Sequence, residues 1–153
     1  MRRKISFFFF LLLLPITQAL TAGDIEPGAD ALVGTWISQA RDSRTEIRKA
    51  GATYCGTLLA GWGNKLYEAD GRTLRRDVRN PDARLRDRPL LDMVILSNLR
   101  YENGTYTGGK LYDARTGKPF SCRMKLRDGK LAMRLYWGLP LLGTTKRWTR
   151  TEQ

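Results

Sequence analysis

Histidine is absent from this sequence of 153 residues. The absence excludes Ser-His and Cys-His nucleophile pairs, the commonest general base and the usual zinc sites. Carboxylates remain as the acid-base option, and those nearest the predicted strands, Glu46, Asp92 and Asp113, are more typical of exposed or turn positions. We therefore expect a protein that is not an enzyme and that uses no metal and no cofactor.

Cysteine is scarce, since the chain has only two, Cys55 and Cys122, and no Cys-x-x-Cys motif. Two isolated cysteines exclude a dithiol exchange site and cannot build a metal site without carboxylate ligands. In an oxidising compartment they could form one disulfide; the other interpretation is a pair of buried thiols. The sequence leaves both interpretations open.

Long apolar runs are missing after the N-terminal region. The single run, Ile5 to Leu14, follows the basic residues Arg2 to Lys4 and leads to small residues ending at Ala19, a pattern typical of a secretory signal peptide. The run is too short for a bilayer span of about 20 residues. We therefore expect a periplasmic or secreted protein with no transmembrane segment after signal cleavage.

The signal-peptide pattern predicts that the chain has three parts. A signal peptide occupies residues 1–19, with cleavage after Ala22 as the alternative, a short leader follows at 20–32, and a single domain covers 33–153. The remainder after cleavage is long enough to bury a core and fold alone.

Acidic residues are few, because 15 Asp and Glu face 27 Lys and Arg, for a net charge of +12. Arginine outnumbers lysine, which favours bidentate contacts with phosphate or carboxylate. An anionic partner and a generally basic proteome both explain this charge. Nucleic acid is not an expected partner, since the chain carries an export signal and no recognisable nucleic-acid-binding motif.

The chain does contain many short apolar or alternating runs separated by Gly, Asn and Asp, which is typical of an all-β domain. The expected strands are residues 33–39, 44–49, 53–60, 93–99, 105–112, 120–127, 131–137 and 144–150. Eight strands with hairpin-length connections predict an antiparallel up-and-down barrel, because closure removes edge strands. Asn103-Gly104 and Asp128-Gly129 are the expected hairpin turns.

Three segments depart from simple alternation. Residues 93–99 are apolar on consecutive positions, so we expect both faces of that strand to be covered. The apolar connection 138–143 is expected to cap the core or to lie exposed at a binding mouth. Residues 61–91 form one long loop between the third and fourth strands, which we interpret as a lid in preference to a disordered insert.

The long loop combines positive charge with apolar anchors. Its seven arginines are Arg72, Arg75, Arg76, Arg79, Arg84, Arg86 and Arg88. Its expected apolar anchors are Leu74, Val78, Leu85, Leu90 and Leu91.

Several motifs occur together in a characteristic order and spacing. They are Gly34-Thr35-Trp36, Arg79-Asn80-Pro81-Asp82, Arg88-Pro89-Leu90-Leu91, Gly108-Gly109-Lys110-Leu111-Tyr112-Asp113 and Trp148-Thr149-Arg150. In these motifs the chain resembles the bacterial exported family catalogued as domain of unknown function 2147, which looks like a variant of the lipocalin and calycin barrels. One departure is Asp92, where the family pattern tends to carry glycine.

The resemblance implies a barrel with a cavity and carries no established activity. It also implies that Trp36 of the first strand is packed by an arginine of the last strand, Arg150 or alternatively Arg147, closing one end of the barrel. The role of such a pair is to stabilise the fold.

Small barrels of eight strands can hold one small ligand, so binding is the leading class of function. The candidate lining residues, with Trp36 at the closed end, are Phe120, Met124, Met133, Leu135 and Trp137. The same residues are compatible with a filled core.

Arginines at the mouth suggest what the ligand carries. Arg79, Arg84, Arg86 and Arg88 could pair with an anionic head group, or could form a solvated, salt-bridged loop. We expect a small apolar or amphiphilic ligand with an anionic head group. The alternative is a non-enzymatic envelope interaction protein that docks on anionic lipid, lipopolysaccharide or a protein partner.

Overall fold

The structure is a computed structural model that describes residues 28–61 and 66–151. The signal peptide expected at 1–19, its cleavage site and most of the leader lie outside the described residues. The predicted fold is confirmed, because eight strands form a closed barrel in chain order. They are β1 (Gly34–Ser38), β2 (Arg44–Ala50), β3 (Thr53–Ala60), β4 (Val94–Glu102), β5 (Thr105–Asp113), β6 (Lys118–Arg127), β7 (Lys130–Tyr136) and β8 (Thr144–Arg150).

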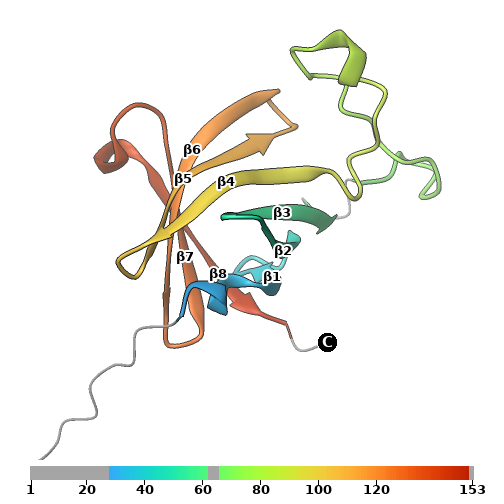
Figure 1. Ribbon diagram of the computed structural model, residues 1–153. Coiled ribbons are helices and arrows are strands. Elements are labelled where there is room, and N and C mark those ends of the chain that lie inside the picture. The colour runs from blue at the N-terminus through green and yellow to red at the C-terminus, as the bar shows by residue number, and fades with distance from the viewer. Residues whose placement is uncertain (1–27, 62–65, 152–153) are drawn as a thin grey trace, which may run out of the picture.

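The barrel closes where β8 lies beside β1 (Figure 1). The two strands pair antiparallel, with Trp36 opposite Arg150 and Ser38 opposite Trp148. Closure gives the first and last strands hydrogen-bonding partners that an open sheet would lack. The helices among the described residues are three short 3₁₀ turns, η1 (Ala29–Leu32), η2 (Ala83–Leu85) and η3 (Pro140–Leu142). No helix in the described ranges is both long and apolar enough to cross a membrane.

The two predicted hairpin turns lie at one end of the barrel, which we call the closed end. Both residues of Asn103-Gly104 and of Asp128-Gly129 have positive φ, as the twist of a two-residue hairpin requires. Connections between antiparallel neighbours alternate between the ends, so the β1–β2, β3–β4, β5–β6 and β7–β8 connections all lie at the opposite, open end. The described part of the long loop, residues 66–92, extends there beyond β3 and β4 (Figure 1); we call it the arginine loop.

Trp36 and Arg150 form a stacked pair at the closed end of the barrel. The buried Trp36 indole donates from Nε1 to Leu32 O at 2.8 Å, and the Arg150 guanidinium carbon lies 4.5 Å from the ring centroid. Arg150 also donates to the carbonyls of Val33 and Ala31. Gly34 has a φ of 132°, and a Cβ there would collide with the Arg150 side chain. The Gly-x-Trp motif therefore makes room for the arginine that stacks on its tryptophan.

The expectation that both faces of the fourth strand are covered is wrong for Val94, which is half-exposed. Ile95 and Leu96 are both buried because the pairing with β3 advances by two residues from Val94 to Leu96 and by one from Thr57 to Gly56. This is a β-bulge, which turns two consecutive side chains toward the interior. The apolar run thus reflects a bulge rather than a strand buried on both faces.

Asp92 precedes β4 with a φ of 61°. Only glycine, and less often Asn or Asp, adopts this left-handed conformation without large strain. The departure from glycine at this position is therefore compatible with the loop-to-strand geometry, and the Asp92 amide donates to Leu58 O at 2.9 Å.

The two cysteines lie in different environments. Cys122 is fully buried in the core, whereas Cys55 is only partly buried, and both are free thiols. Burial raises the pKa of the Cys122 thiol to about 12. Of the two interpretations of the cysteines, the structure shows unpaired thiols.

Candidate functional site

The barrel encloses a cavity of about 750 Å³ that reaches from Trp36 to the open end. Its walls come from all strands except β3, and most of the residues that line it deep in the barrel are apolar. The apolar lining consists of Trp36, Ile47, Ile95, Leu96, Leu111, Phe120, Leu131, Met133, Leu135 and Trp148, with Trp137 and Leu142 at the rim. A volume of this size is typical of small-molecule sites.

Four of the five apolar residues expected to line a cavity do so. Phe120, Met133, Leu135 and Trp137 line it, whereas Met124 is buried in the core outside the lining. Trp137 lies beyond the end of β7 and is half-exposed, with its ring centroid 5.6 Å from that of Phe120. The two aromatic rings thus form one side of the mouth.

The closed end is filled by tyrosines instead of being hollow. Tyr54 and Tyr106 pack edge to face with centroids 5.6 Å apart, and Tyr101 lies 5.0 Å from Tyr106. The Tyr54 hydroxyl donates to Asp30 at 2.6 Å and the Tyr106 hydroxyl to Ala29 O at 2.8 Å. The barrel is therefore a filled core at one end and a cavity at the other.

Two polar atoms in the cavity lining lack a hydrogen-bond partner. Thr45 Oγ1 and Trp148 Nε1 are buried and unsatisfied in the structure. They belong to β2 and β8, which flank β1 on its two sides. Both atoms are covered by the atoms around them, and a buried polar group without a partner costs about 1–3 kcal/mol.

The acidic residues of the cavity have partners. Asp113 accepts two hydrogen bonds from the guanidinium of Arg115, at 3.0 and 3.2 Å, and Asp42 accepts one from the Ser38 hydroxyl at 2.6 Å. Arg115 therefore neutralises the charge of Asp113, whereas Asp42 keeps its negative charge with a neutral hydroxyl as its partner.

Two basic residues of the lining contrast with these acids. Lys146 and Arg147 on β8 both line the cavity near its mouth, and neither side chain makes an ion pair or hydrogen bond within the described residues. Lys146 shares a face of β8 with Trp148 and lies opposite Met133 of β7. Because Arg115 balances Asp113, these two cations exceed the single charge of Asp42, and the lining carries a net positive charge.

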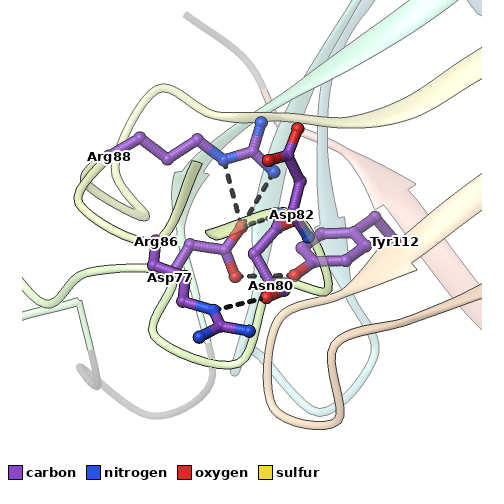
Figure 2. Close-up of polar contacts among 6 residues, drawn as sticks. All are labelled: Asp77, Asn80, Asp82, Arg86, Arg88 and Tyr112. Carbon is purple, nitrogen blue, oxygen red and sulfur yellow. Dashed lines mark hydrogen bonds and ion pairs between the residues drawn. The ribbon is translucent and has the colours of Figure 1, made fainter. Parts of the chain in front are cut away.

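The arginine loop is attached to the barrel through the buried carboxylate of Asp77 (Figure 2). Arg88 donates to its Oδ2 from Nε at 3.0 Å and from Nη2 at 2.8 Å. Tyr112 of β5 donates to its Oδ1 at 2.7 Å, and Asn80 Nδ2 donates to Oδ2 at 2.7 Å. Arg86 completes the network by donating to Asn80 O at 2.8 Å. We call these five residues the Asp77 network.

The four arginines expected at the mouth do not line the cavity. Arg88 and Arg86 belong to the Asp77 network, and Arg84 forms an exposed bidentate pair with Asp82 at 2.8 and 3.0 Å. Arg79 donates to the carbonyl of Arg115, and its own backbone packs so closely on Gly117 that a Cβ there would collide with it. The structure thus shows these arginines holding the loop to itself and to the β5–β6 turn.

The apolar anchors of the arginine loop are partly those expected. Leu90 is buried and Leu91 half-buried, and with Leu66 and Met93 they pack beside Ile95 and Leu58 in a second hydrophobic cluster. Val78 and Leu85 are exposed, so their expected role as anchors is wrong. Polar contacts to the buried Asp77 hold that part of the loop instead.

Sequence reasoning missed the basic residues that do line the cavity. Lys146 lies two positions before Trp148 in a predicted strand, and side chains two positions apart in a strand share a face. This period of two could have assigned Lys146 to the inner face of β8. The pattern of β8 is weak because most of its residues are exposed.

Comparisons with known proteins agree with this architecture. Protein HP1028 from Helicobacter pylori, described as belonging to the lipocalin family, superposes with a TM-score of 0.66 at 24% identity, over 79% of this chain and 83% of that one. At this identity the likeness shows the fold. No curated protein matches the sequence at a significant level. The model of the family described as "uncharacterized protein conserved in bacteria" (DUF2147) matches residues 34–150, and the chain therefore belongs to that family.

Proposed function

We propose that this chain is an exported, non-enzymatic binding protein whose barrel holds a small amphiphile with an anionic head group. The observation that carries the proposal is the apolar cavity of about 750 Å³ with the unpaired cation Lys146 in its lining. An apolar wall favours a hydrocarbon portion, and an unpaired cation at the mouth favours a negative charge on the same molecule.

Two lining residues with unsatisfied buried atoms, Thr45 and Trp148, refine this class of ligand. The Trp148 indole N–H is a donor only, so it needs an acceptor oxygen or nitrogen, and Thr45 Oγ1 can both donate and accept. A plain hydrocarbon would leave both atoms without a partner. We infer a ligand with its head group near Lys146 and its tail beside Leu131 and Met133. An acceptor of this ligand bonds Trp148 Nε1 once the atoms that cover this N–H shift.

The proposal also states that the protein is not an enzyme and that it is exported. The chain has no histidine, and the carboxylates of the cavity, Asp42 and Asp113, are held by Ser38 and Arg115. The signal-peptide pattern at 1–19 supports a periplasmic or secreted location.

Ligand titration tests the proposal. The exported chain would be examined by native mass spectrometry for a co-purifying molecule, and then titrated with dodecanoate, dodecanol and dodecylammonium against a polarity-sensitive dye. We expect dodecanoate to displace the dye at the lowest concentration and dodecylammonium at the highest, because the cavity lining carries a net positive charge.

Two variants separate the parts of the site. Lys146→Gln should weaken dodecanoate binding about tenfold and leave dodecanol binding nearly unchanged, whereas Leu135→Trp should weaken both by filling the cavity. Lys130→Gln, a lysine at the closed end, is the matched control and should change neither affinity. If none of the three probes binds and nothing co-purifies in repeated preparations, the proposal is wrong.

A further inference from the structure

The β7–β8 connection presents the most exposed group of large apolar side chains in the described chain. Leu139, Leu141 and Leu142 are exposed by 66%, 84% and 79%, and the neighbouring Trp137 by 55%. Figure 1 shows this connection projecting past the ends of the strands. We call residues 137–143 the leucine tip. Exposed leucines scattered singly need no explanation, whereas a group of them on one turn is a candidate interaction site.

The leucine tip is braced by Arg134 of β7. Its Nε donates to Pro140 O at 2.9 Å, Nη2 donates to Leu141 O at 2.7 Å and Nη1 donates to Thr145 Oγ1 at 3.0 Å. Within the tip, the Leu142 amide donates to Leu139 O at 3.1 Å. These bonds hold the backbone of the tip, so less backbone entropy remains to be lost on binding.

Positive charge surrounds the tip. The residues nearest the tip along β7 and β8, positions 134–147, include Arg134, Lys146 and Arg147 and no acidic residue. The Lys118 ammonium lies 5.4 Å from the centroid of the Trp137 ring, whose Nε1 donates to Pro119 O at 3.0 Å. Exposed leucines beside a half-exposed tryptophan, with Lys118, Lys146 and Arg147 at the same end of the barrel, match the composition of segments that bind an anionic bilayer surface.

We propose that the leucine tip inserts into the surface of an anionic lipid bilayer. A protein partner is the weaker fit, because a stable protein interface buries about 800 Å² on each side and a convex tip of four apolar residues offers well under that area. Shallow insertion into lipid needs only the apolar side chains and attraction between cations and lipid phosphates. Leu142 also lines the cavity rim, so insertion brings the mouth to the membrane surface.

Vesicle co-sedimentation tests this inference. The exported chain would be mixed with phosphatidylcholine vesicles with or without about a third phosphatidylglycerol, whose negative surface attracts basic residues. We expect binding to the anionic vesicles at least tenfold tighter than to the neutral ones. The combined variant Leu139→Ser and Leu141→Ser should reduce binding to anionic vesicles at least tenfold.

The matched control is Val78→Ser, which removes a similarly exposed apolar side chain from the arginine loop. It should bind vesicles like the unchanged protein. Normal binding by the leucine variant, or equal loss in the Val78 variant, would overturn the proposal. So would a wild-type chain that binds neither kind of vesicle.

The inference stands apart from the ligand proposal, because Leu139 and Leu141 do not line the cavity. The leucine variant should therefore bind dodecanoate normally if the cavity site is as proposed. Loss of dodecanoate binding with normal thermal unfolding would show that the tip belongs to the ligand site, and would overturn its assignment to lipid.

Discussion

The hydroxyl of Tyr112 donates a 2.7 Å hydrogen bond to Oδ1 of Asp77, a residue 35 positions earlier in the chain. Tyr112 lies in β5 and also lines the cavity, whereas Asp77 lies in the arginine loop. This single contact therefore joins the longest connection of the barrel to the wall of its cavity. Because Asp77 is fully buried, the carboxylate needs all the donors that surround it.

Removal of the Asp77 carboxylate should be costly. In Asp77→Ala, Arg88, Tyr112 and Asn80 lose their shared acceptor, and we expect the free energy of unfolding to fall by about 3 kcal/mol. Urea unfolding monitored by circular dichroism measures the change. Asp87→Ala removes the exposed partner of Arg76 at 3.4 Å and should cost less than about 1 kcal/mol. Equal losses in the two variants would contradict the role of the network.

Tyr112→Phe should make stability depend less on alkaline pH. Burial, with the hydrogen bond to Asp77 as the second cause, raises the pKa of Tyr112 to about 12 from its ordinary value of 10.0. The folded state therefore favours the neutral phenol, an advantage that is complete below pH 10 and is lost as the pH rises toward 12.

The test compares urea unfolding of the two proteins across this window. At pH 8 the variant should be less stable by about 1 kcal/mol, and the difference should shrink above pH 10. Tyr67→Phe, at an exposed tyrosine of the arginine loop, should behave like the unchanged protein at every pH. A difference that stays constant or widens with pH would disagree with the assigned shift.

Replacing Arg150 should loosen the closed end. Arg150→Met keeps an extended side chain and loses both the stacking on Trp36 and the hydrogen bonds to Val33 O and Ala31 O. We expect a loss of about 2 kcal/mol in the free energy of unfolding. Arg127→Met, at an exposed position near the end of β6, serves as the control and should have little effect. Thermal unfolding of both variants decides the matter.

The thiols should differ in reactivity. Cys55 is partly exposed, whereas Cys122 is fully buried and its pKa is raised to about 12 by burial, so little reactive thiolate forms. A maleimide reagent should label one thiol in the native protein and two in denaturant. Failure to label either thiol in denaturant without a reductant would show a disulfide, contrary to the structure.

Much of the fold could be predicted because its determinants are local. The alternation of Cys122, Met124 and Leu126 along β6 follows from the period of two in a strand, and Asn103-Gly104 supplies the positive φ that a hairpin needs. Eight such strands with short connections have few ways to satisfy their edges other than closure. The local pattern predicted β4 wrongly, as a strand covered on both faces. A β-bulge and a strand covered on both faces both place consecutive apolar residues in the interior, so the pattern does not distinguish them.

The candidate site could be predicted only in part. Phe120, Met133 and Leu135 were predictable because strand alternation assigns them to the inner face. Met124 lies on the same face, but its depth in the barrel puts it among the packed tyrosines and not beside the cavity. The depth of a residue in the barrel depends on how far its strand extends past the neighbouring strands. This offset follows from the register of strand pairing across the whole sheet.

The sequence by itself determined the class of fold, the order of the strands and the excess of positive charge, since these depend on residue periodicity, turn residues and composition. Only the tertiary structure decided which cations are free to meet a ligand. Arg88 is held by Asp77, while Lys146 has no partner among the described residues. The physical reason is that an ion pair depends on distances in space between residues far apart in the chain, which composition and periodicity do not encode.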